Sequence, residues 1–373
     1  MTNIKTTTPF YDQHIKAGAK IVPFAGVEMP LHYESGIIKE HEWVRTRAGL
    51  FDVSHMGQCL VHGKGATGFL SRVTPSDFNK VSIMQCKYTV LTTEGGGIVD
   101  DLIITRLEED KYHLVLNASR NDHDLIWLKN HLTGDVNIEP FAPRTALIAL
   151  QGPYAEEALM ATLNPNAHIP ELGFMRGLQT TLMGADVLIT RTGYTGEDGF
   201  EIAITGDENT ARHIWLAICG HDNVKPVGLG ARDSLRLEAG YPLYGHDIDE
   251  TTTPVEASLS WVISKGHSGF LGEEVIKRQL VDGPERKRFG VRITEKGVAR
   301  EGTRLYSPDG HKIGTLTSGG FSPTTKMSVG QGYIKTDYAI PDKIILAEVR
   351  NRRLRARTHG LNFINPRDIK PGA

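Results

Sequence analysis

The sequence predicts an α+β body followed by a small all-β domain. The chain has 373 residues, which is more than one hydrophobic core usually organises, so two or three domains are expected. Helical patterns and β-rich runs are mixed as far as about residue 280. From Lys287 onward only short strands recur between Gly and Pro turns, which is typical of an all-β module.

The first third of the chain combines a helix, a set of hairpins and a second helix. Turn signals fill the segment up to residue 34, and a helical pattern runs from Ser35 to Ala48. Residues 51–117 contain short β-rich runs separated by glycine or acidic turns, which predicts β-hairpins. Residues 121–132 begin with Asn and Asp and repeat apolar residues at helical spacing, so a helix is expected there.

The rest of the body alternates strands and helices. Residues 144–153 form an apolar run stopped by Gly-Pro, which predicts a buried strand before an Ala/Glu/Leu-rich helix. Residues 185–205 read as a strand, a glycine-rich turn and a second strand, and a helix from about Glu208 to Cys219 follows. In 349–357 Arg alternates with Leu and Ala, which we interpret as an edge strand with a solvated face.

Composition excludes several classes of protein. The formal net charge of -2 argues against a nucleic-acid-binding surface. The three cysteines, Cys59, Cys86 and Cys219, are far apart, which excludes a disulfide framework and fits a reducing compartment. No apolar run approaches the roughly 18 residues of a membrane span, and no presequence is recognisable. We expect a cytoplasmic protein, or a mitochondrial matrix protein if this is a mature eukaryotic form.

Motifs for common cofactor and hydrolase sites are missing. The sequence has no Walker A and no Gly-x-Ser-x-Gly motif. The Gly-x-Gly of 227–234 lacks a third glycine and a surrounding βαβ unit, and the HEWVR of 41–45 lacks the second His of a zinc protease. We therefore expect no metal, no flavin and no nicotinamide cofactor.

Two adjacent aspartates, Asp100 and Asp101, follow three glycines in the segment TTEGGGIVDDLIITR. Side chains alternate along a strand, which places Ile98, Asp100, Leu102 and Ile104 on one face and Val99, Asp101, Ile103 and Thr105 on the other. A carboxylate among apolar neighbours costs free energy unless it is paired, hydrogen-bonded or facing a ligand. Turn capping and a functional role are about equally favoured, and the residues alone do not separate the two aspartates.

A second glycine-rich stretch, RTGYTGEDGFEI (191–202), presents Tyr194 and several carboxylates around a tight turn. Glu201 lies inside the following strand and is the least turn-like of these carboxylates. For Glu197 and Asp198 we favour plain turn chemistry.

Arg232 and Arg236 lie four residues apart, on one face and near the start of a predicted helix. The helix dipole opposes a guanidinium at that end. A carboxylate ligand would favour it there, and an internal salt bridge with Asp233 or Glu238 is an equally good explanation.

The stretch FDVSHMG contains His55 and Met56 at the end of a strand. Alone, it favours a hydrogen-bonded structural histidine over a base, and a packing role for the methionine.

Five of these stretches together resemble one family. FDVSHMG, GGGIVDDLI, ALQGP, GYTGEDGFE and GLGARDSLRLEAGYPLYGHDIDETTTPVEASLSW occur in the order found in the aminomethyltransferases, or T-proteins, of the glycine cleavage system. The resemblance runs from about Pro9 to about Gly330, and the last stretch is the most specific.

The resemblance implies a three-domain cloverleaf around a central folate cavity. Residues 1–50 and 141–280 would form a discontinuous domain, 51–140 an inserted one, and 285–373 a small C-terminal β-barrel or jelly roll. The implied activity moves a one-carbon unit from the aminomethyl-lipoyl group of the H-protein to the co-substrate tetrahydrofolate. The products are 5,10-methylenetetrahydrofolate, ammonia and the dihydrolipoyl carrier. The alternative is a folate-binding regulatory or iron–sulfur assembly protein, whose Lys-Gly-Cys-Tyr-type motif is absent.

The resemblance also assigns site residues. It favours Asp101 as the catalytic carboxylate and leaves Asp100 as the structural member of the pair, with the glycine run as a hairpin turn. Val27 replaces a common Trp, and the C-terminus lacks the usual Pro-Phe-Val, so Arg367 is a candidate contact only. The implied substrate- and folate-binding residues are Glu201, Arg232, Tyr194, Tyr88, Met56 and Asn117.

Overall fold

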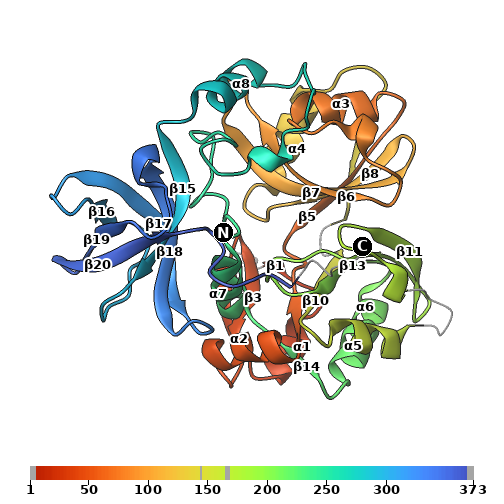
Figure 1. Cartoon of the computed structure of the whole chain (residues 1–373). Coiled ribbons are helices and arrows are strands. Elements are labelled where there is room, and N and C mark those ends of the chain that lie inside the picture. Colours follow the sequence, from red (N-terminus) through yellow and green to blue (C-terminus); the bar gives the residue numbers. More distant parts are fainter. Residues whose placement is uncertain (1–5, 143–144, 164–168, 368–373) are drawn as a thin grey trace, which may run out of the picture.

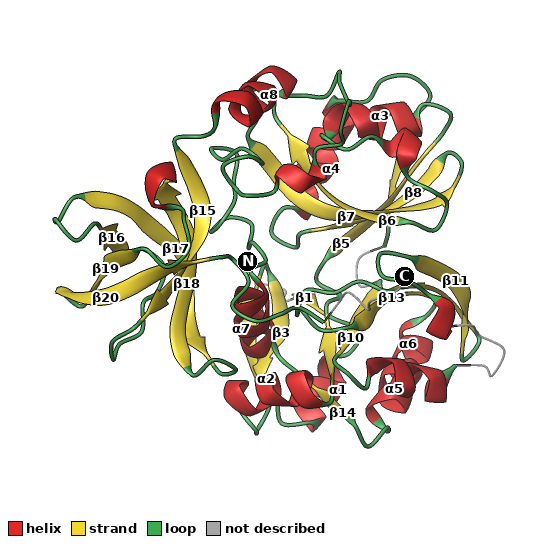
Figure 2. Cartoon of the chain, viewed as in Figure 1, coloured by secondary structure: helices red, strands yellow, loops and turns green. Residues whose placement is uncertain are grey.

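The computed structural model describes residues 6–142, 145–163 and 169–367. They form three lobes around a common centre (Figure 1). One lobe is a closed barrel, and the other two are sheets that carry helices (Figure 2). The predicted α+β class with a C-terminal barrel is confirmed, whereas the expected domain boundaries stay predictions. None of the helices in the described ranges combines the length and the apolar character that crossing a bilayer takes.

The lobe at the lower right of Figure 1 contains a six-stranded sheet in the order β11-β12-β13-β10-β4-β14. Its strand β10 is buried on both faces, as predicted: Ile148 belongs to the core under helices α5 and α6, and Leu147 to the core beside α7. Glu201 pairs with Ala149 across β13 and β10, so it lies on the face toward α7. Arg144, the predicted start of this strand, lies outside the described residues. The elements are β4 (Ala48–Asp52), β10 (Ala146–Gln151), α5 (Ala155–Thr162), η2 (Ile169–Glu171), β11 (Gly177–Leu182), β12 (Ala185–Thr190), β13 (Gly199–Thr205), α6 (Glu208–Cys219), β14 (Val224–Pro226) and α7 (Leu229–Ala239).

The upper right lobe contains a five-stranded sheet in the order β6-β7-β8-β5-β9. On strand β7 a bulge leaves Val99 unpaired, because Leu91 pairs with Asp100 and Thr92 with Ile98. Val99 therefore packs into the core under the helices, and Ile98 belongs to a cluster on the other face. The predicted alternation is wrong for these two residues and right from Asp100 onward. The elements are β5 (Gly57–His62), α3 (Ala66–Val73), η1 (Phe78–Lys80), β6 (Cys86–Thr92), β7 (Ile98–Glu108), β8 (Lys111–Leu116), α4 (Asn121–Asn130) and β9 (Asn137–Pro140).

The C-terminal lobe is a closed barrel in the order β15-β18-β17-β16-β19-β20. Strand β20 alternates exposed arginines with the buried side chains of Leu354, Ala356 and Thr358. It pairs with both β19 and β15, so the prediction of an edge strand is wrong and the solvated face is that of a barrel. The elements are η3 (Ser260–Val262) and α8 (Glu273–Asp282) before the barrel, then β15 (Arg286–Ile293), β16 (Arg304–Tyr306), β17 (Lys312–Ser322), β18 (Met327–Lys335), η4 (Thr336–Tyr338), β19 (Ile344–Val349) and β20 (Arg352–His359).

A small three-stranded sheet near the N-terminus was not predicted. It contains β1 (Thr6–Thr7), β2 (Lys20–Phe24) and β3 (Val27–His32), with α1 (Tyr11–Lys16) between the first two strands. The sequence suggested turns because Pro lies in both longer strands. β1 pairs only with the first two residues of β3, so the later proline lies beyond the three-stranded part. Helix α2 (Ile37–Thr46) follows inside the predicted helix and packs against α7.

The glycine run is a hairpin turn, as predicted. The amide of Thr93 donates to the carbonyl of Gly97, and the amide of Gly96 to the carbonyl of Thr93, both at 2.9 Å. Gly96 has a φ of +82°, which glycine adopts at least cost. A Cβ on Gly97 would lie 1.9 Å from the carbonyl oxygen of Glu250, so this turn fits closely under a neighbouring loop.

We expect Gly97→Ala to lower the free energy of unfolding by about 1–3 kcal/mol, because the loop at Glu250 must move. Activity should fall as well, since Gly97 directly precedes β7, which carries Asp101. Urea unfolding measures the first effect. Gly95→Ala is the matched control: its nearest neighbour would be 3.8 Å away, so a change within about 0.5 kcal/mol is expected. Equal stabilities of the two variants would contradict the close fit.

Candidate active site

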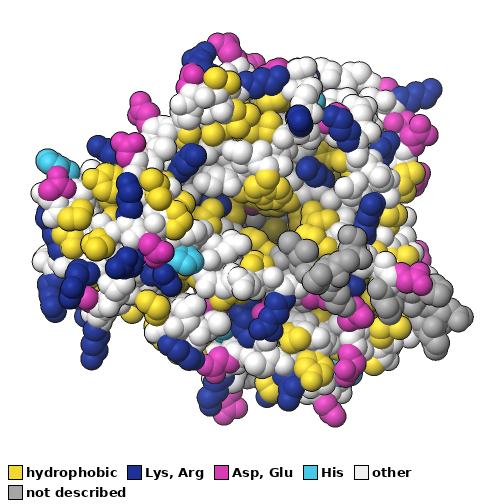
Figure 3. All heavy atoms as spheres, in the orientation of Figure 1, with side chains coloured by type: hydrophobic (Ala, Val, Ile, Leu, Met, Phe, Trp, Pro, Cys, Tyr) yellow, Lys and Arg dark blue, Asp and Glu magenta, His cyan; other side chains and the backbone are white. Residues whose placement is uncertain are grey.

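The seven predicted site residues come from separate segments, and all seven are half-buried. Figure 3 shows that the molecular surface is hollowed near the centre of this face, with hydrophobic side chains around the opening. Tyr88 lies on β6, Asp101 on β7, Asn117 after β8, Met56 before β5, Tyr194 between β12 and β13, Glu201 on β13 and Arg232 on α7. Two of the three lobes therefore supply these side chains. Asp101 contacts Tyr88 and Asn117, and Arg232 contacts Tyr194.

Asp101 is held by two hydrogen bonds. The hydroxyl of Tyr88 donates to Oδ2 and the amide of Asn117 to Oδ1, both at 2.8 Å. Burial and the neighbouring charge of Asp100 raise the pKa of Asp101 to about 7, although both hydrogen bonds act in the opposite direction. The carboxyl group therefore exchanges its proton near neutral pH. The predicted Tyr88, Asn117 and Asp101 form one contact group.

Tyr88 stacks on Trp261, with ring centroids 5.2 Å apart. Burial and the charge of Asp101 raise the pKa of Tyr88, so the phenol keeps its proton and remains a donor to the carboxylate. Trp261 is 61% exposed, an unusual position for a large ring that stacks on a half-buried tyrosine. Trp261 ends the most specific of the five sequence stretches, but it was not among the predicted site residues.

Arg232 lies in the first turns of α7 and has its guanidinium carbon 4.7 Å from the centre of the Tyr194 ring. Its Nη1 is buried and has no hydrogen-bond partner among the described residues. Burial lowers the pKa of Arg232, while the charge of Glu201 acts in the opposite direction. The internal salt bridge that the sequence allowed does not form for this arginine. An unpaired buried donor of this kind is suited to an acceptor group on a ligand.

Arg236, in contrast, is a structural arginine. It forms ion pairs with Asp233 at 2.8 Å and with Asp247 at 2.7 Å. The structure places it in the last turn of α7, so its predicted place near the helix start is wrong and the dipole there favours its charge. The predicted partner Asp233 is correct, and Asp247 was missed because it is 11 residues away.

Glu201 and Tyr194 are linked to the same region by polar contacts. The hydroxyl of Thr192 donates to Glu201 at 2.6 Å. The Tyr194 hydroxyl donates to the carbonyl of Pro242, and its ring stacks on Tyr241 with centroids 5.8 Å apart. Burial raises the pKa of Tyr194, so the phenol is neutral. These contacts fix both side chains in place.

The structure agrees with the packing role predicted for Met56 but not with the hydrogen-bonded role predicted for His55. Met56 packs against the apolar cluster beside α7, as expected. His55 has a buried Nδ1 without a hydrogen-bond partner among the described residues, so the predicted hydrogen-bonded histidine is wrong for this atom. Burial and the charge of Arg232 lower the pKa of His55 to about 4. Across the residues the structure describes, no group of three or more His, Cys, Asp or Glu could hold a metal ion.

Comparison with known families identifies the fold. A family described as "GCVT N-terminal domain" matches residues 10–267, and one described as "Glycine cleavage T-protein C-terminal barrel domain" matches residues 286–364. The chain belongs to the glycine cleavage T-protein family. The boundary between the two matches falls just before β15, where the barrel begins.

Relatives along the whole chain agree with this family. The aminomethyltransferase of Geobacillus kaustophilus (strain HTA426) is 40% identical, over 95% of this chain and 98% of the relative. The probable mitochondrial aminomethyltransferase of Schizosaccharomyces pombe is 42% identical, over 96% and 92%. The crystal structure of the glycine cleavage system aminomethyltransferase T from Bartonella henselae has a TM-score of 0.91 at 39% identity, covering 98% of this chain and 100% of that one.

The predicted family and activity are therefore confirmed: the chain is an aminomethyltransferase of the glycine cleavage system. The alternative, a regulatory or iron–sulfur assembly protein of the same fold, is not favoured.

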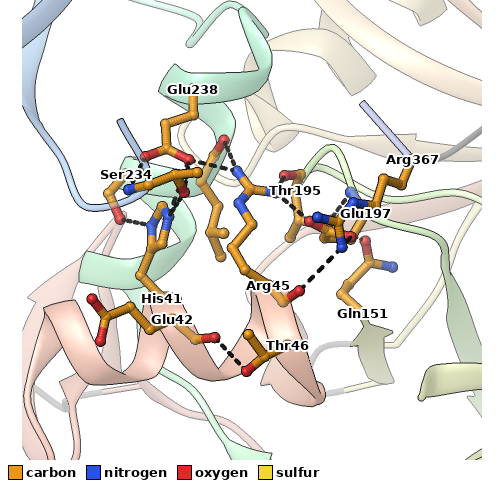
Figure 4. A network of polar contacts seen from close by, with 12 residues as sticks. His41, Glu42, Arg45, Thr46, Gln151, Thr195, Glu197, Ser234, Glu238 and Arg367 are labelled. Carbon is orange, nitrogen blue, oxygen red and sulfur yellow. Dashed lines mark hydrogen bonds and ion pairs between the residues drawn. The ribbon is translucent and has the colours of Figure 1, made fainter. Parts of the chain in front are cut away.

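This T-protein also contains a buried polar network behind α7 (Figure 4). Arg45 on α2 forms ion pairs with Glu197 and Glu238, both at 3.0 Å. Arg367 reaches the same network, 3.3 Å from the carbonyl of Arg45 and 3.7 Å from Glu197. The prediction of plain turn chemistry is wrong for Glu197, since a buried ion pair holds it. Arg367 contacts this network, and its candidate role as a ligand contact stays a prediction.

Proposed function

We propose that the hollow between the lobes binds tetrahydrofolate and that Asp101 is the catalytic carboxylate. The position of Asp101 is the main support: it lies on the half-buried face of β7, between a tyrosine hydroxyl and an asparagine amide. A carboxyl group with a pKa of about 7 can accept and return a proton at physiological pH. It can also stabilise the positive charge that develops as ammonia leaves.

The proposed reaction needs no oxidant and no net proton from solvent. Two carbon–nitrogen bonds form between the one-carbon unit and the folate. The carbon–sulfur and carbon–nitrogen bonds of the neutral aminomethyl-lipoyl group break. The two protons released by the folate nitrogens end on the lipoyl sulfur and on the departing ammonia. Asp101 would hold one of them in transit, while Tyr88 and Asn117 keep its carboxyl group oriented.

The partner we propose is the lipoylated H-protein, in a transient complex, and the proposed location is the cytoplasm. A direct assay tests the function: purified protein mixed with an aminomethylated lipoyl carrier should release ammonia when tetrahydrofolate is added. A release rate that does not respond to tetrahydrofolate would contradict the proposal.

We further propose that Arg232 and Glu201 bind polar groups of the substrate, with Tyr194 and Met56 lining the same cavity. The free Nη1 of Arg232 supports a bidentate contact with a ligand acceptor. Arg232→Lys keeps the charge but loses the planar fork. We expect the KM for tetrahydrofolate to rise by about 10–100-fold, the equivalent of one charged hydrogen bond.

Steady-state kinetics at several folate concentrations measure this effect. Arg357→Lys on the exposed face of β20 is the control, and its kinetics should equal those of the unmodified protein. An Arg232→Lys variant with an unchanged KM would show that the arginine does not contact the folate.

A further inference from the structure

The strand that ends in ALQGP carries one polar side chain, Gln151, at its last residue. Gln151 is 0% exposed, so it cannot touch a ligand in the hollow. It pairs with Gly199 at the start of β13. Its carboxamide therefore lies against the glycine-rich turn that joins β12 to β13.

Two hydrogen bonds join this carboxamide to the turn. Its Nε2 donates to the carbonyl of Thr192 at 3.0 Å, and its Oε1 accepts from the hydroxyl of Thr195 at 2.7 Å. The same hydroxyl accepts from the amide of Glu197 at 3.3 Å, so its own proton is directed to Gln151. An amide side chain offers the donor and the acceptor that these two groups require. Gln151 thus holds the backbone on both sides of Tyr194.

The turn approaches the carboxamide closely. A Cβ on Gly193 would lie 1.9 Å from Oε1 of Gln151, and a Cβ on Gly199 would lie 2.4 Å from the carbonyl oxygen of Leu150. Glycine at these two positions allows the backbone to reach the end of β10. The sequence of the turn and the glutamine are therefore matched in shape.

The held segment leads to two of the proposed binding residues. Thr192, whose carbonyl accepts from Gln151, donates its hydroxyl to Glu201 at 2.6 Å. The ring of Tyr194, between the two held residues, lies 4.7 Å from the guanidinium carbon of Arg232. A shift of this turn would therefore move the tyrosine ring and the donor to Glu201 together.

We propose that Gln151 is a positioning residue, whose buried carboxamide fixes the turn so that Tyr194 and Glu201 keep the geometry that binds the folate. This inference rests on the proposed binding roles of those two residues. Asp101 is held separately, by two residues of the upper right lobe. A loss of the carboxamide should therefore weaken folate binding and leave the chemical step nearly unchanged.

Gln151→Met tests this split in the complete protein, because it keeps the length of the side chain and removes both hydrogen-bonding groups. The KM for tetrahydrofolate should rise by about tenfold, the equivalent of one hydrogen bond, while kcat stays within about threefold. Leu159→Ala is the control, since Leu159 packs in the core on the other face of the same sheet. Its midpoint of urea unfolding should fall, and its KM should not change.

Gly193→Ala disturbs the same contact from the side of the turn, and it keeps the proposal testable if Gln151→Met does not fold. Its KM for tetrahydrofolate should also rise, because the carboxamide must move. In the Gln151→Ala background the added methyl group occupies space left by the carboxamide, so the double variant should raise the KM by less than the product of the separate effects. Gly206→Ala is the matched control: its nearest neighbour would be 3.7 Å away, and its KM should equal that of the unmodified protein.

A Gln151→Met variant that loses stability but keeps its KM would show a purely structural role and overturn the proposal. A fall in kcat at constant KM, or independent effects of the changes at Gly193 and Gln151, would also overturn it. Glu201→Gln separates this failure from that of the proposed function. If Glu201→Gln raises the KM and Gln151→Met does not, only this inference fails, and if neither raises it, the proposed binding site fails as well.

Discussion

Asp101→Asn should reduce the rate of tetrahydrofolate-dependent ammonia release by about 10²–10⁴-fold, the usual contribution of a positioned acid–base group. Asparagine has nearly the same shape and can still accept a hydrogen bond from Tyr88. It cannot carry the negative charge or the proton. Stability should not fall, because the pKa of Asp101 is raised to about 7 and its ionisation therefore costs folding free energy above its ordinary pKa.

The pH dependence gives a second test of the same residue. If the ionised form is active, kcat/KM of the unmodified protein should rise with pH through an apparent pKa near 7, a value that belongs to the coupled aspartates together. Asp100→Asn is the comparison, and we expect a loss of less than about tenfold, since the amide oxygen can still accept one of the two hydrogen bonds that Asn117 donates to Asp100. An active Asp101→Asn variant together with an inactive Asp100→Asn variant would show that Asp100, and not Asp101, is the catalytic aspartate.

The choice between these aspartates shows how far the sequence could be interpreted. Strand alternation correctly placed Asp100 and Asp101 on opposite faces, because the period of two depends only on local backbone geometry. It failed at Ile98 and Val99, since a β-bulge depends on how two strands pair and leaves no local signal. Which face borders the hollow depends on the packing of three lobes, and periodicity alone could not give it.

Long-range pairing explains the other differences. The sequence identified Arg236 as a residue that needs an acidic partner, but the buried Asp247 lies outside its helix. Tyr88 and Asn117 followed from the family resemblance, whereas the contact of Trp261 with Tyr88 required the fold. The burial of Asp124 could not be predicted, because an aspartate in the first turn of a helix resembles a solvated charge, yet its side chain is fully buried.

The buried network of Figure 4 should contribute strongly to stability. Arg45→Met should lower the free energy of unfolding by about 3–5 kcal/mol, because Glu197 and Glu238 lose a cation in a site without solvent access. Activity should also fall, since Glu238 belongs to α7, the helix that carries Arg232. Urea unfolding at pH 8 measures the change. Lys326→Met, which breaks an exposed pair with Glu42 at 2.8 Å, is the control and should cost less than about 1 kcal/mol.

The pH dependence of this network has a defined direction. Burial opposes the charge of Glu238, but hydrogen bonds from His41, Ser322 and Thr324 outweigh it and lower the pKa of Glu238 to about 2. A carboxyl group with a lowered pKa stabilises the fold above its ordinary pKa of 4.5, and this stabilisation is lost as the pH falls from about 4.5 to 2. Because the guanidinium of Arg45 lies 3.0 Å from Glu238, its removal should raise the pKa of Glu238 toward its ordinary value. The loss of stability between pH 5 and pH 3 should therefore be smaller in Arg45→Met than in the unmodified protein, and equal slopes would show that Arg45 does not stabilise the ionised glutamate.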